Sequence, residues 1–171
     1  MICESAYTQY AKNFEVRNLT FMNTPEDAVG MEGQETESTL TITAAVEHCW
    51  VHHNTFLAPS ISSPAESDKS EGDGSCDFKR GRYFTCSYNY FEECHKTNLV
   101  GSGGTSVQYC LTYHHNLWYG CKARQPLARQ ANIHFYNNFI IGTTDTVASL
   151  RANAYMFAEK NYFLGCSRPI E

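Results

Sequence analysis

The sequence predicts an all-β protein that folds as a parallel β-helix, a solenoid of stacked rungs. The first observation is a phrase that recurs six times: an alternating apolar segment, then an asparagine closely followed by an aromatic residue. The second is that the segments before these asparagines alternate with period two and are rich in β-branched and aromatic residues. No stretch has the pattern of a long amphipathic helix. Units this short bury their inner faces only by stacking on one another.

The repeat sets the expected position of each rung. Its copies are VRNLTF, VHHNTF, SYNYF, YHHNLW, FYNNFI and AEKNYF, with Asn18, Asn54, Asn89, Asn116, Asn138 and Asn161. The last three intervals between them are 27, 22 and 23 residues, whereas the first two are 36 and 35 and contain polar inserts that we place on loops. Equivalent residues of successive rungs stack about 4.8 Å apart. We therefore expect a core column of aromatic residues and a turn column of asparagines, a residue that tolerates left-handed backbone.

Eight cysteines in 171 residues are a weak indication of an extracellular protein. No pair has the C-x-x-C spacing of a zinc or redox site. Cys94, Cys121 and Cys166 each fall five residues after an asparagine of the repeat, which favours a packing role for these three. Disulfides and buried thiols both remain open for the set as a whole.

Composition narrows the class of protein. A length of 171 residues with 42% hydrophobic content predicts one soluble domain, and a formal net charge of −5 argues against a nucleic-acid partner. The apolar runs are too short to cross a membrane, and the opening MICESAYTQYAKN has neither the basic start nor the apolar stretch of a targeting signal. We expect a monomer.

A candidate site begins with KARQPLARQ, residues 122–130, where cations surround a proline. Such a run by itself is usually a solvated basic turn. Other cations, however, lie about one rung apart along the chain, so a solenoid would bring them to one face as a basic groove suited to an extended polyanion. The cations of this predicted groove are Lys79, Lys96, Arg124, Arg129 and Arg151.

Two carboxylates accompany these cations. Asp73 and Asp77 lie in EGDGSCD, at the end of the longest acidic insert. They are either salt-bridged to the neighbouring cations or part of a site for a hard cation such as Ca²⁺, which accepts several carboxylate oxygens on loops. An acidic pair alone does not separate these two interpretations.

Taken together, these segments resemble the pectate lyase family, whose members are polysaccharide lyases with a right-handed parallel β-helix. The resemblance covers roughly residues 13–163. It rests on VRNLTF, EHCWVHHNTF, DGSCDFKRG, SYNYF, HKTNLVG, YHHNLW, RQPLAR and HFYNN in this order. The combination of R-x-P-x-x-R with an upstream H-K-x-x-L-x-G is the specific part.

The resemblance implies calcium-dependent β-elimination of polygalacturonate, by a secreted enzyme. Cations aimed at the sugar carboxylate would stabilise the negative charge that develops when the neighbouring carbon loses its proton. Arg124 resembles the arginine that removes the C5 proton, although a guanidinium ordinarily stays protonated. By the same resemblance, Lys96 and Arg129 hold substrate carboxylate and stabilise charge, Lys79 and Arg151 bind substrate, and Asp73 and Asp77 bind Ca²⁺.

The sequence departs from the family pattern at three places. Ala44 and Ala45 stand where a further calcium-binding aspartate is usual, so we expect a replacement from Glu47, Glu66, Asp68 or Glu71. His52 replaces the aspartate of the W-x-D-H phrase. We predict no zinc site at the His52–His53 and His114–His115 pairs, because adjacent strand residues point to opposite faces. Finally, residues 1–171 are expected to form one β-helix domain that lacks the family's N-terminal cap and C-terminal rungs.

Three alternative functions remain. The first is a catalytically inactive β-helix that binds acidic polysaccharide, and the second is a pectin lyase, which cleaves methylated chains without calcium. Pectin hydrolases, the third, need clustered aspartates, and their N-T-D, D-D, G-H-G and R-I-K phrases are absent. The joint presence of Lys96, Arg124 and Arg129 makes a purely structural repeat the least favoured interpretation.

Overall fold

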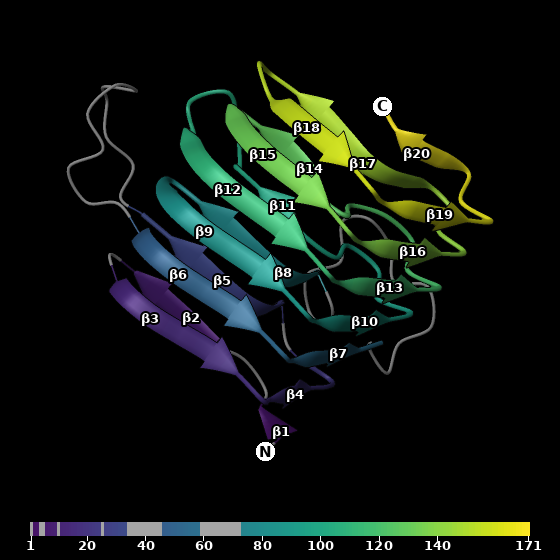
Figure 1. Ribbon diagram of the computed structural model, residues 1–171. Helices are drawn as coiled ribbons and strands as arrows, with labels where there is room; N and C mark the ends of the chain where they lie inside the picture. Colours follow the sequence, from purple (N-terminus) through teal and green to yellow (C-terminus); the bar gives the residue numbers. More distant parts are fainter. Residues whose placement is uncertain (1, 4–5, 10, 25, 34–45, 59–72) are drawn as a thin grey trace.

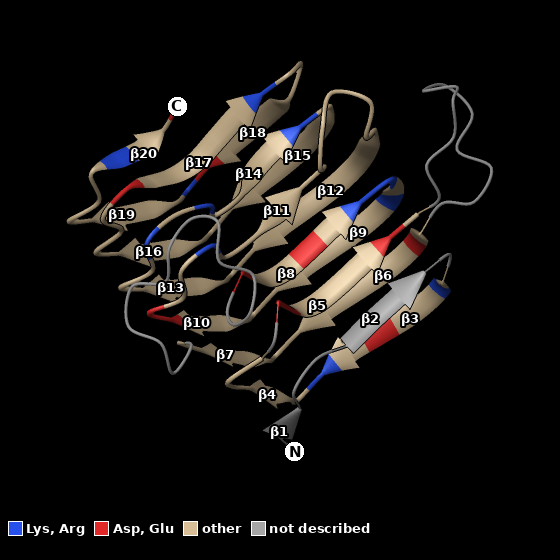
Figure 2. Ribbon diagram, turned by 180° about the vertical axis from the view of Figure 1, so that it is seen from behind, with Lys and Arg blue, Asp and Glu red and all other residues tan. Residues whose placement is uncertain are grey.

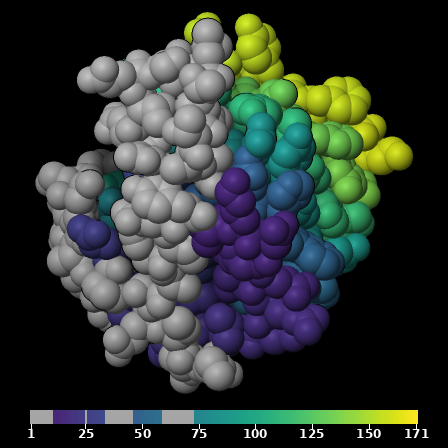
Figure 3. All heavy atoms as spheres, turned by 90° about the vertical axis from the view of Figure 1, so that its left-hand side faces the viewer, coloured from purple at the N-terminus to yellow at the C-terminus, as the bar shows by residue number. Residues whose placement is uncertain are grey.

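The computed structural model of the chain is a right-handed parallel β-helix, as the sequence predicts (Figure 1). It describes residues 2–3, 6–9, 11–24, 26–33, 46–58 and 73–171. The chain runs repeatedly through three parallel sheets, here called A, B and C, and each circuit adds one strand to every sheet. Successive rungs follow the sequence from the N-terminus to the C-terminus (Figure 3). No helix long and apolar enough to cross a membrane occurs among these residues.

The strands of the three sheets are as follows. Sheet A contains β1 (Ile2–Cys3), β4 (Thr20–Phe21), β7 (Thr55–Leu57), β10 (Tyr90–Glu92), β13 (Leu117–Tyr119), β16 (Phe139–Ile141) and β19 (Tyr162–Leu164). Sheet B contains β2 (Ala6–Gln9), β5 (Asp27–Glu32), β8 (Gly74–Lys79), β11 (Leu99–Val100), β14 (Leu127–Arg129), β17 (Thr146–Arg151) and β20 (Arg168–Ile170). Sheet C contains β3 (Lys12–Arg17), β6 (Val46–His52), β9 (Gly81–Ser87), β12 (Gln108–His114), β15 (Ala131–Tyr136) and β18 (Tyr155–Glu159).

An aromatic column fills the core behind sheet A, which confirms the sequence prediction. Phe21, Phe56, Phe91 and Trp118 stack in order, with ring centroids 4.9, 4.6 and 5.2 Å apart. These separations match the strand spacing of about 4.8 Å, because each ring sits on the next rung of one sheet. The column thus converts the sequence repeat into continuous apolar packing, which stabilises each rung through its neighbours.

An asparagine ladder runs along the turn between sheets C and A. The Nδ2 amide of Asn89 donates to Oδ1 of Asn116, and the Nδ2 of Asn116 donates to Oδ1 of Asn138, at 3.2 and 3.1 Å. The same Oδ1 atoms accept the backbone N–H of the preceding ladder residue. Asn54 begins the ladder and Asn161 ends it. These bonds satisfy backbone groups buried at the turn, where they lack a strand partner.

Two details of the predicted column are wrong. Thr20 pairs with Thr55, so Leu19 rather than Asn18 occupies the ladder position of the first copy, and its backbone N–H donates to Asn54 Oδ1. The left-handed residue is the one directly before the ladder position, as at Asn18 and His53, with φ of 57° and 53°. The chain therefore turns at the left-handed residue, and the residue that follows it makes the ladder hydrogen bonds.

The cysteines of the repeat occupy equivalent positions, as predicted, and Thr143 takes this position on the rung between Cys121 and Cys166. The thiols of Cys94, Cys121 and Cys166 lie within 3.4–3.6 Å of the carbonyl oxygens of Phe56, Phe91 and Ile140, each one rung away. All seven cysteines whose side chains are described are free thiols, and five of them are buried. Free thiols, most of them buried, are thus the outcome for this part of the chain.

Candidate functional site

Three of the predicted cations lie at the ends of sheet B strands. Lys79 ends β8, Arg129 ends β14 and Arg151 ends β17, so the tips of these arrows are blue in Figure 2. Arg129 and Arg151 are directly paired residues of adjacent strands. Sheet register therefore brings these cations, which are distant in the sequence, to the same side of sheet B, at the C-terminal ends of its strands. The rung spacing predicts this arrangement.

Lys96 and Arg124 lie in the loops that lead into β11 and β14. Lys96 forms an isolated parallel bridge with Ala123, so Arg124 comes directly after the residue paired with Lys96. Arg124 has a left-handed backbone, with φ of 67°, and its carbonyl accepts the N–H of Asn98 at 2.7 Å. A non-glycine residue in this conformation persists only where its surroundings hold it. The loop therefore fixes the position of Arg124 relative to Lys96.

The arginines interact electrostatically. Burial lowers the pKa of Arg129, and the charges of Arg151 and Arg124 lower it further. Nη1 of Arg129 donates to the carbonyl of Gly101 at 3.3 Å. The positive charges of Arg124 and Arg151 thus disfavour the charged form of Arg129, and an anion bound among the three would stabilise it.

The carboxylates lie among these cations. Asp73 accepts an ion-paired hydrogen bond from Lys96 at 2.6 Å, and Lys96 is only 3% exposed. Asp77 is buried on β8 and accepts the backbone N–H of Leu99 at 2.8 Å. Lys79 Nζ lies 4.0 Å from Asp77 Oδ2. In this structure each of the two acids is therefore paired with a lysine, as the salt-bridge interpretation predicts.

Asp27 is a residue of this site that the sequence analysis missed. It opens β5, pairs with Gly74 and places Oδ2 3.7 Å from Lys79 Nζ. A Cβ added at Gly74 would stand 2.5 Å from Asp27 Oδ1 and 2.9 Å from Asp77 Oδ1, so the two carboxylates converge on a space that only glycine leaves open. A long insert separates them in sequence, which hides their register.

The electrostatics of Asp77 reflect this neighbour. Burial raises the pKa of Asp77 well above its ordinary value, and the charge of Asp27 raises it further. Lys79, the Leu99 amide and Arg124 act in the opposite direction. Two like charges this close, with Asp77 buried and Asp27 half-buried, favour a compensating cation beside them.

The sequence offers four acids as replacements for the absent calcium-binding aspartate, and only Glu47 of these four lies among the described residues. Ala44, Ala45, Glu66, Asp68 and Glu71 lie outside the described residues. Glu47 is on sheet C, where Lys12 Nζ and Arg82 Nη2 lie 3.0 and 2.5 Å from its carboxylate oxygens. Glu47 is thus committed to another face, and Asp27 is the acid that neighbours Asp77.

The donor set fits calcium in part. Among the described residues, no group of three or more His, Cys, Asp or Glu side chains is arranged to hold a metal ion by itself. Asp27 and Asp77 nevertheless supply two carboxylates across Gly74, the ligand type that Ca²⁺ prefers. Calcium takes six to eight oxygens, so water and an acidic substrate would have to supply most of the remainder.

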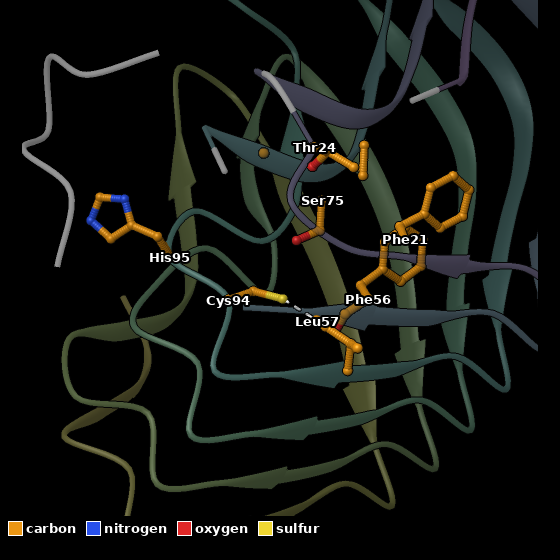
Figure 4. Close-up of a pocket in the computed structure, with 9 residues that line it drawn as sticks. Phe21, Thr24, Phe56, Leu57, Ser75, Cys94 and His95 are labelled. Atoms are coloured by element: carbon orange, nitrogen blue, oxygen red, sulfur yellow. Dashed lines mark hydrogen bonds between the residues drawn. The ribbon is translucent and has the colours of Figure 1, made fainter. Parts of the chain in front are cut away.

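A small cavity lies beside this region (Figure 4). It is lined by residues that include Thr24, Ser75, Cys94 and His95, with Phe21 and Phe56 at its apolar side. Its volume of about 10 Å³ holds at most one water molecule. This cavity is therefore too small to hold a sugar.

Fold and site together define a class: a right-handed parallel β-helix that carries lysines, arginines and acids along one sheet. The chain belongs to the pectate lyase family, whose model, described as "Pectate lyase", matches residues 3–169. It is 33% identical over 124 residues to pectate lyase B of Dickeya chrysanthemi, covering 71% of this chain and 33% of that protein. It is 28% identical over 162 residues to pectate lyase 1 of Pectobacterium carotovorum, covering 94% and 41%.

Solved structures agree on the fold. Pectate lyase II from Xanthomonas campestris superposes with a TM-score of 0.75 at 22% identity, covering 94% of this chain and 57% of that one. A pectate lyase from Bacillus sp. N165, solved in complex with trigalacturonate, gives a TM-score of 0.68 at 22% identity, covering 90% and 57%. The chain spans about a third of the length of pectate lyase B and about two fifths of the length of pectate lyase 1.

Proposed function

We propose that this chain carries the active-site rungs of a pectate lyase, which cleaves (1→4)-α-D-galacturonan by calcium-dependent β-elimination. The observation that supports it most is the gathering of Lys96, Arg124 and Arg129 beside the Asp27–Asp77 pair, on sheet B and the loops that lead into its strands. A polymer with one carboxylate per sugar complements a row of cations at rung spacing. Membership of the family supports the same reaction.

The proposed roles follow from the chemistry of β-elimination. Arg124 removes the proton from C5, the electron pair forms the C4–C5 double bond, and the C4–O bond breaks as the leaving oxygen takes a proton. Lys96 and Arg129 hold the carboxylate beside C5 and stabilise the charge that develops there. Lys79 and Arg151 bind neighbouring sugars. Asp77, Asp73 and the newly located Asp27 are the proposed calcium ligands, and bound Ca²⁺ would act as a Lewis acid toward the substrate carboxylate.

Further expectations rest on the same proposal. Polygalacturonate is the proposed partner, and a secreted, monomeric protein with one β-helix domain over residues 1–171 is the proposed context. Relatives of this kind are pectate lyases, and one structural neighbour was solved with trigalacturonate.

A second candidate is an inactive module that binds acidic polysaccharide. The ion pair between Lys96 and Asp73 favours it, because a lysine already neutralised by a carboxylate stabilises developing charge poorly. A pectin lyase is the remaining alternative, and it would act on methylated chains without calcium.

The experiment that tests these proposals follows the absorbance of the unsaturated uronate product. The chain is incubated with polygalacturonate, first with Ca²⁺ and then with excess chelator, and circular dichroism checks its fold. A calcium-dependent rise supports the proposal. A parallel incubation uses methylated pectin, and a rise that occurs only there and ignores the chelator would identify a pectin lyase. No rise with either substrate, from folded protein that still binds polygalacturonate, would identify the binding module.

A further inference from the structure

Two pairs of neighbouring histidines lie at equivalent positions of sheet C, on a different sheet from the cationic site. His52 ends β6 and His114 ends β12, and both register with Ser87, the last residue of β9 between them. Each is followed by a second histidine. The Nδ1 atoms lie 2.6 Å apart in the His52–His53 pair and 2.8 Å apart in the His114–His115 pair.

The expectation that these paired side chains point to opposite faces was wrong. His53 and His115 adopt the left-handed backbone of the turn, with φ of 53° and 54°. This conformation breaks the alternation of an extended strand and turns the second imidazole toward the first. The rings of each pair meet edge to face, at centroid distances of 4.9 and 5.0 Å.

The His52 ring is held in place on several sides. Its Nε2 lies 2.7 Å from Glu15 Oε1 on the adjacent strand β3. Trp50 stacks on it at 3.8 Å and is itself fixed by donating its Nε1–H to Ser87 Oγ. His53 is exposed and stacks on Tyr88. One ring of the pair is therefore rigid, and the other is open to solvent.

The Glu15 contact decides what His52 Nδ1 can do. A carboxylate accepts hydrogen bonds only, so His52 Nε2 carries the proton and, in the neutral ring, Nδ1 presents a lone pair. Nδ1 of His53 then either donates a proton to that lone pair or presents a second lone pair to a shared cation. Carboxylate–histidine contacts of this kind also orient metal-ligating imidazoles and raise their basicity.

We propose that His52 and His53 form a two-imidazole site for a divalent transition-metal ion of the Ni²⁺ and Cu²⁺ type. Two nitrogens about 2.1 Å from one ion are about 3.0 Å apart at a right angle and about 3.4 Å apart in a tetrahedron. The observed 2.6 Å is a hydrogen-bond distance, shorter than both separations, so the rings would move apart on binding by about 0.4 Å for a right angle and about 0.8 Å for a tetrahedron. The smaller movement favours the right angle, which is the geometry of square-planar and octahedral ions. Water completes the coordination, since the described residues hold no cluster of three donors.

The second pair is a natural comparison within the same molecule. His114 and His115 approach each other similarly, but no acidic side chain contacts His114 among the described interactions; Tyr136 stacks on its ring instead. Without a carboxylate to orient the ring, this pair binds the same ion more weakly. The difference expected from such a contact is about 10–100-fold in affinity.

The test titrates the whole chain with Ni²⁺ alone, in a Cys110→Ser background that removes the exposed thiol. Isothermal titration calorimetry measures affinity, and paramagnetic broadening of backbone amide NMR signals locates the ion. His53→Asn removes one ligand and keeps a residue that the turn accepts, since Asn18 and Asn137 occupy the equivalent position on other rungs. His115→Asn is the matched control.

We expect His53→Asn to abolish the tighter binding, Glu15→Gln to weaken it about 10–100-fold, and His115→Asn to leave it unchanged. Broadening should centre on residues 52–53. The proposal is overturned if Ni²⁺ produces no binding heat, if His53→Asn binds like the parent, or if His115→Asn removes the tighter site. The outcome does not depend on lyase activity.

Discussion

Lys96 and Asp73 form a hydrogen-bonded ion pair of 2.6 Å across adjacent rungs, with the lysine 3% exposed and the aspartate side chain 19% exposed. The pair joins a proposed substrate cation to a proposed calcium ligand. An ion that binds Asp73 would weaken its hold on Lys96 and release the ammonium group toward a substrate carboxylate. The two proposed roles would therefore be electrostatically coupled.

This coupling predicts the stability of variants. Asp73→Ala should lower the free energy of unfolding by about 1–3 kcal/mol, because it deprives a buried ammonium group of this carboxylate. Lys96→Met should cost less, since Asp73 keeps some contact with water. In a double-mutant cycle followed by urea denaturation, the double variant should lose less than the sum of the two. Strict additivity would show that the pair contributes nothing.

Arg124→Lys is expected to reduce turnover about 10²–10⁴-fold, the usual contribution of a general base, with polygalacturonate binding changed little. The lysine keeps the positive charge but places no nitrogen where the guanidinium ends. Product absorbance measures turnover, and calorimetry with trigalacturonate measures binding. Arg151→Lys, at the strand end beside Arg129, is the control and should affect binding more than turnover. Full activity in Arg124→Lys would remove Arg124 from its proposed role.

Asp27→Asn should raise the Ca²⁺ concentration needed for half-maximal activity about 10-fold or more, because one of two converging carboxylates is lost. Activity assays across a calcium series test this. Glu47→Gln is the matched control, since Glu47 is engaged by Lys12 and Arg82 on sheet C and should leave the requirement unaltered. Equal effects of the two substitutions would place the calcium site elsewhere.

Asn116→Ala should lower the free energy of unfolding by about 3–5 kcal/mol. It removes the acceptor of the Asn89 N–H and the donor to the Cys86 carbonyl, and each buried group left unsatisfied costs about 1–3 kcal/mol. Urea denaturation gives the measurement. Asn137→Gly, at the exposed left-handed position of a neighbouring rung, should change stability little. A small loss for Asn116→Ala would mean that water replaces the ladder.

The cysteines should differ in reactivity. Burial, with a contribution from the charge of Glu47, raises the pKa of Cys49 to about 12, so almost no thiolate forms at neutral pH. Cys110 is exposed. Alkylation by iodoacetamide in native protein at mildly alkaline pH, followed by mass spectrometry, should label Cys110 first and leave Cys49 unmodified until unfolding. Early labelling of Cys49 would contradict its burial.

The repeat by itself determined the β-helix, the aromatic column and most of the asparagine ladder. Each rung repeats the same local alternation, and stacking is the arrangement that buries every inner face. The rung-like spacing also predicted that the cations would share one face. Lys79, Arg129 and Arg151 lie at the ends of sheet B strands, and Lys96 and Arg124 lie in the loops that lead into such strands. The family was recognisable from the order of these short motifs.

Only the tertiary structure decided three other features. Asp27 meets Asp77 across Gly74 because strand register, which no spacing reveals across a long insert, aligns β5 with β8. Leu19 replaces Asn18 in the ladder because a shift of one residue exchanges the turn position for the ladder position. The histidine rings converge because a left-handed residue reverses the direction that strand alternation predicts. Periodicity specifies which residues face inward, whereas register and backbone handedness specify which of them meet.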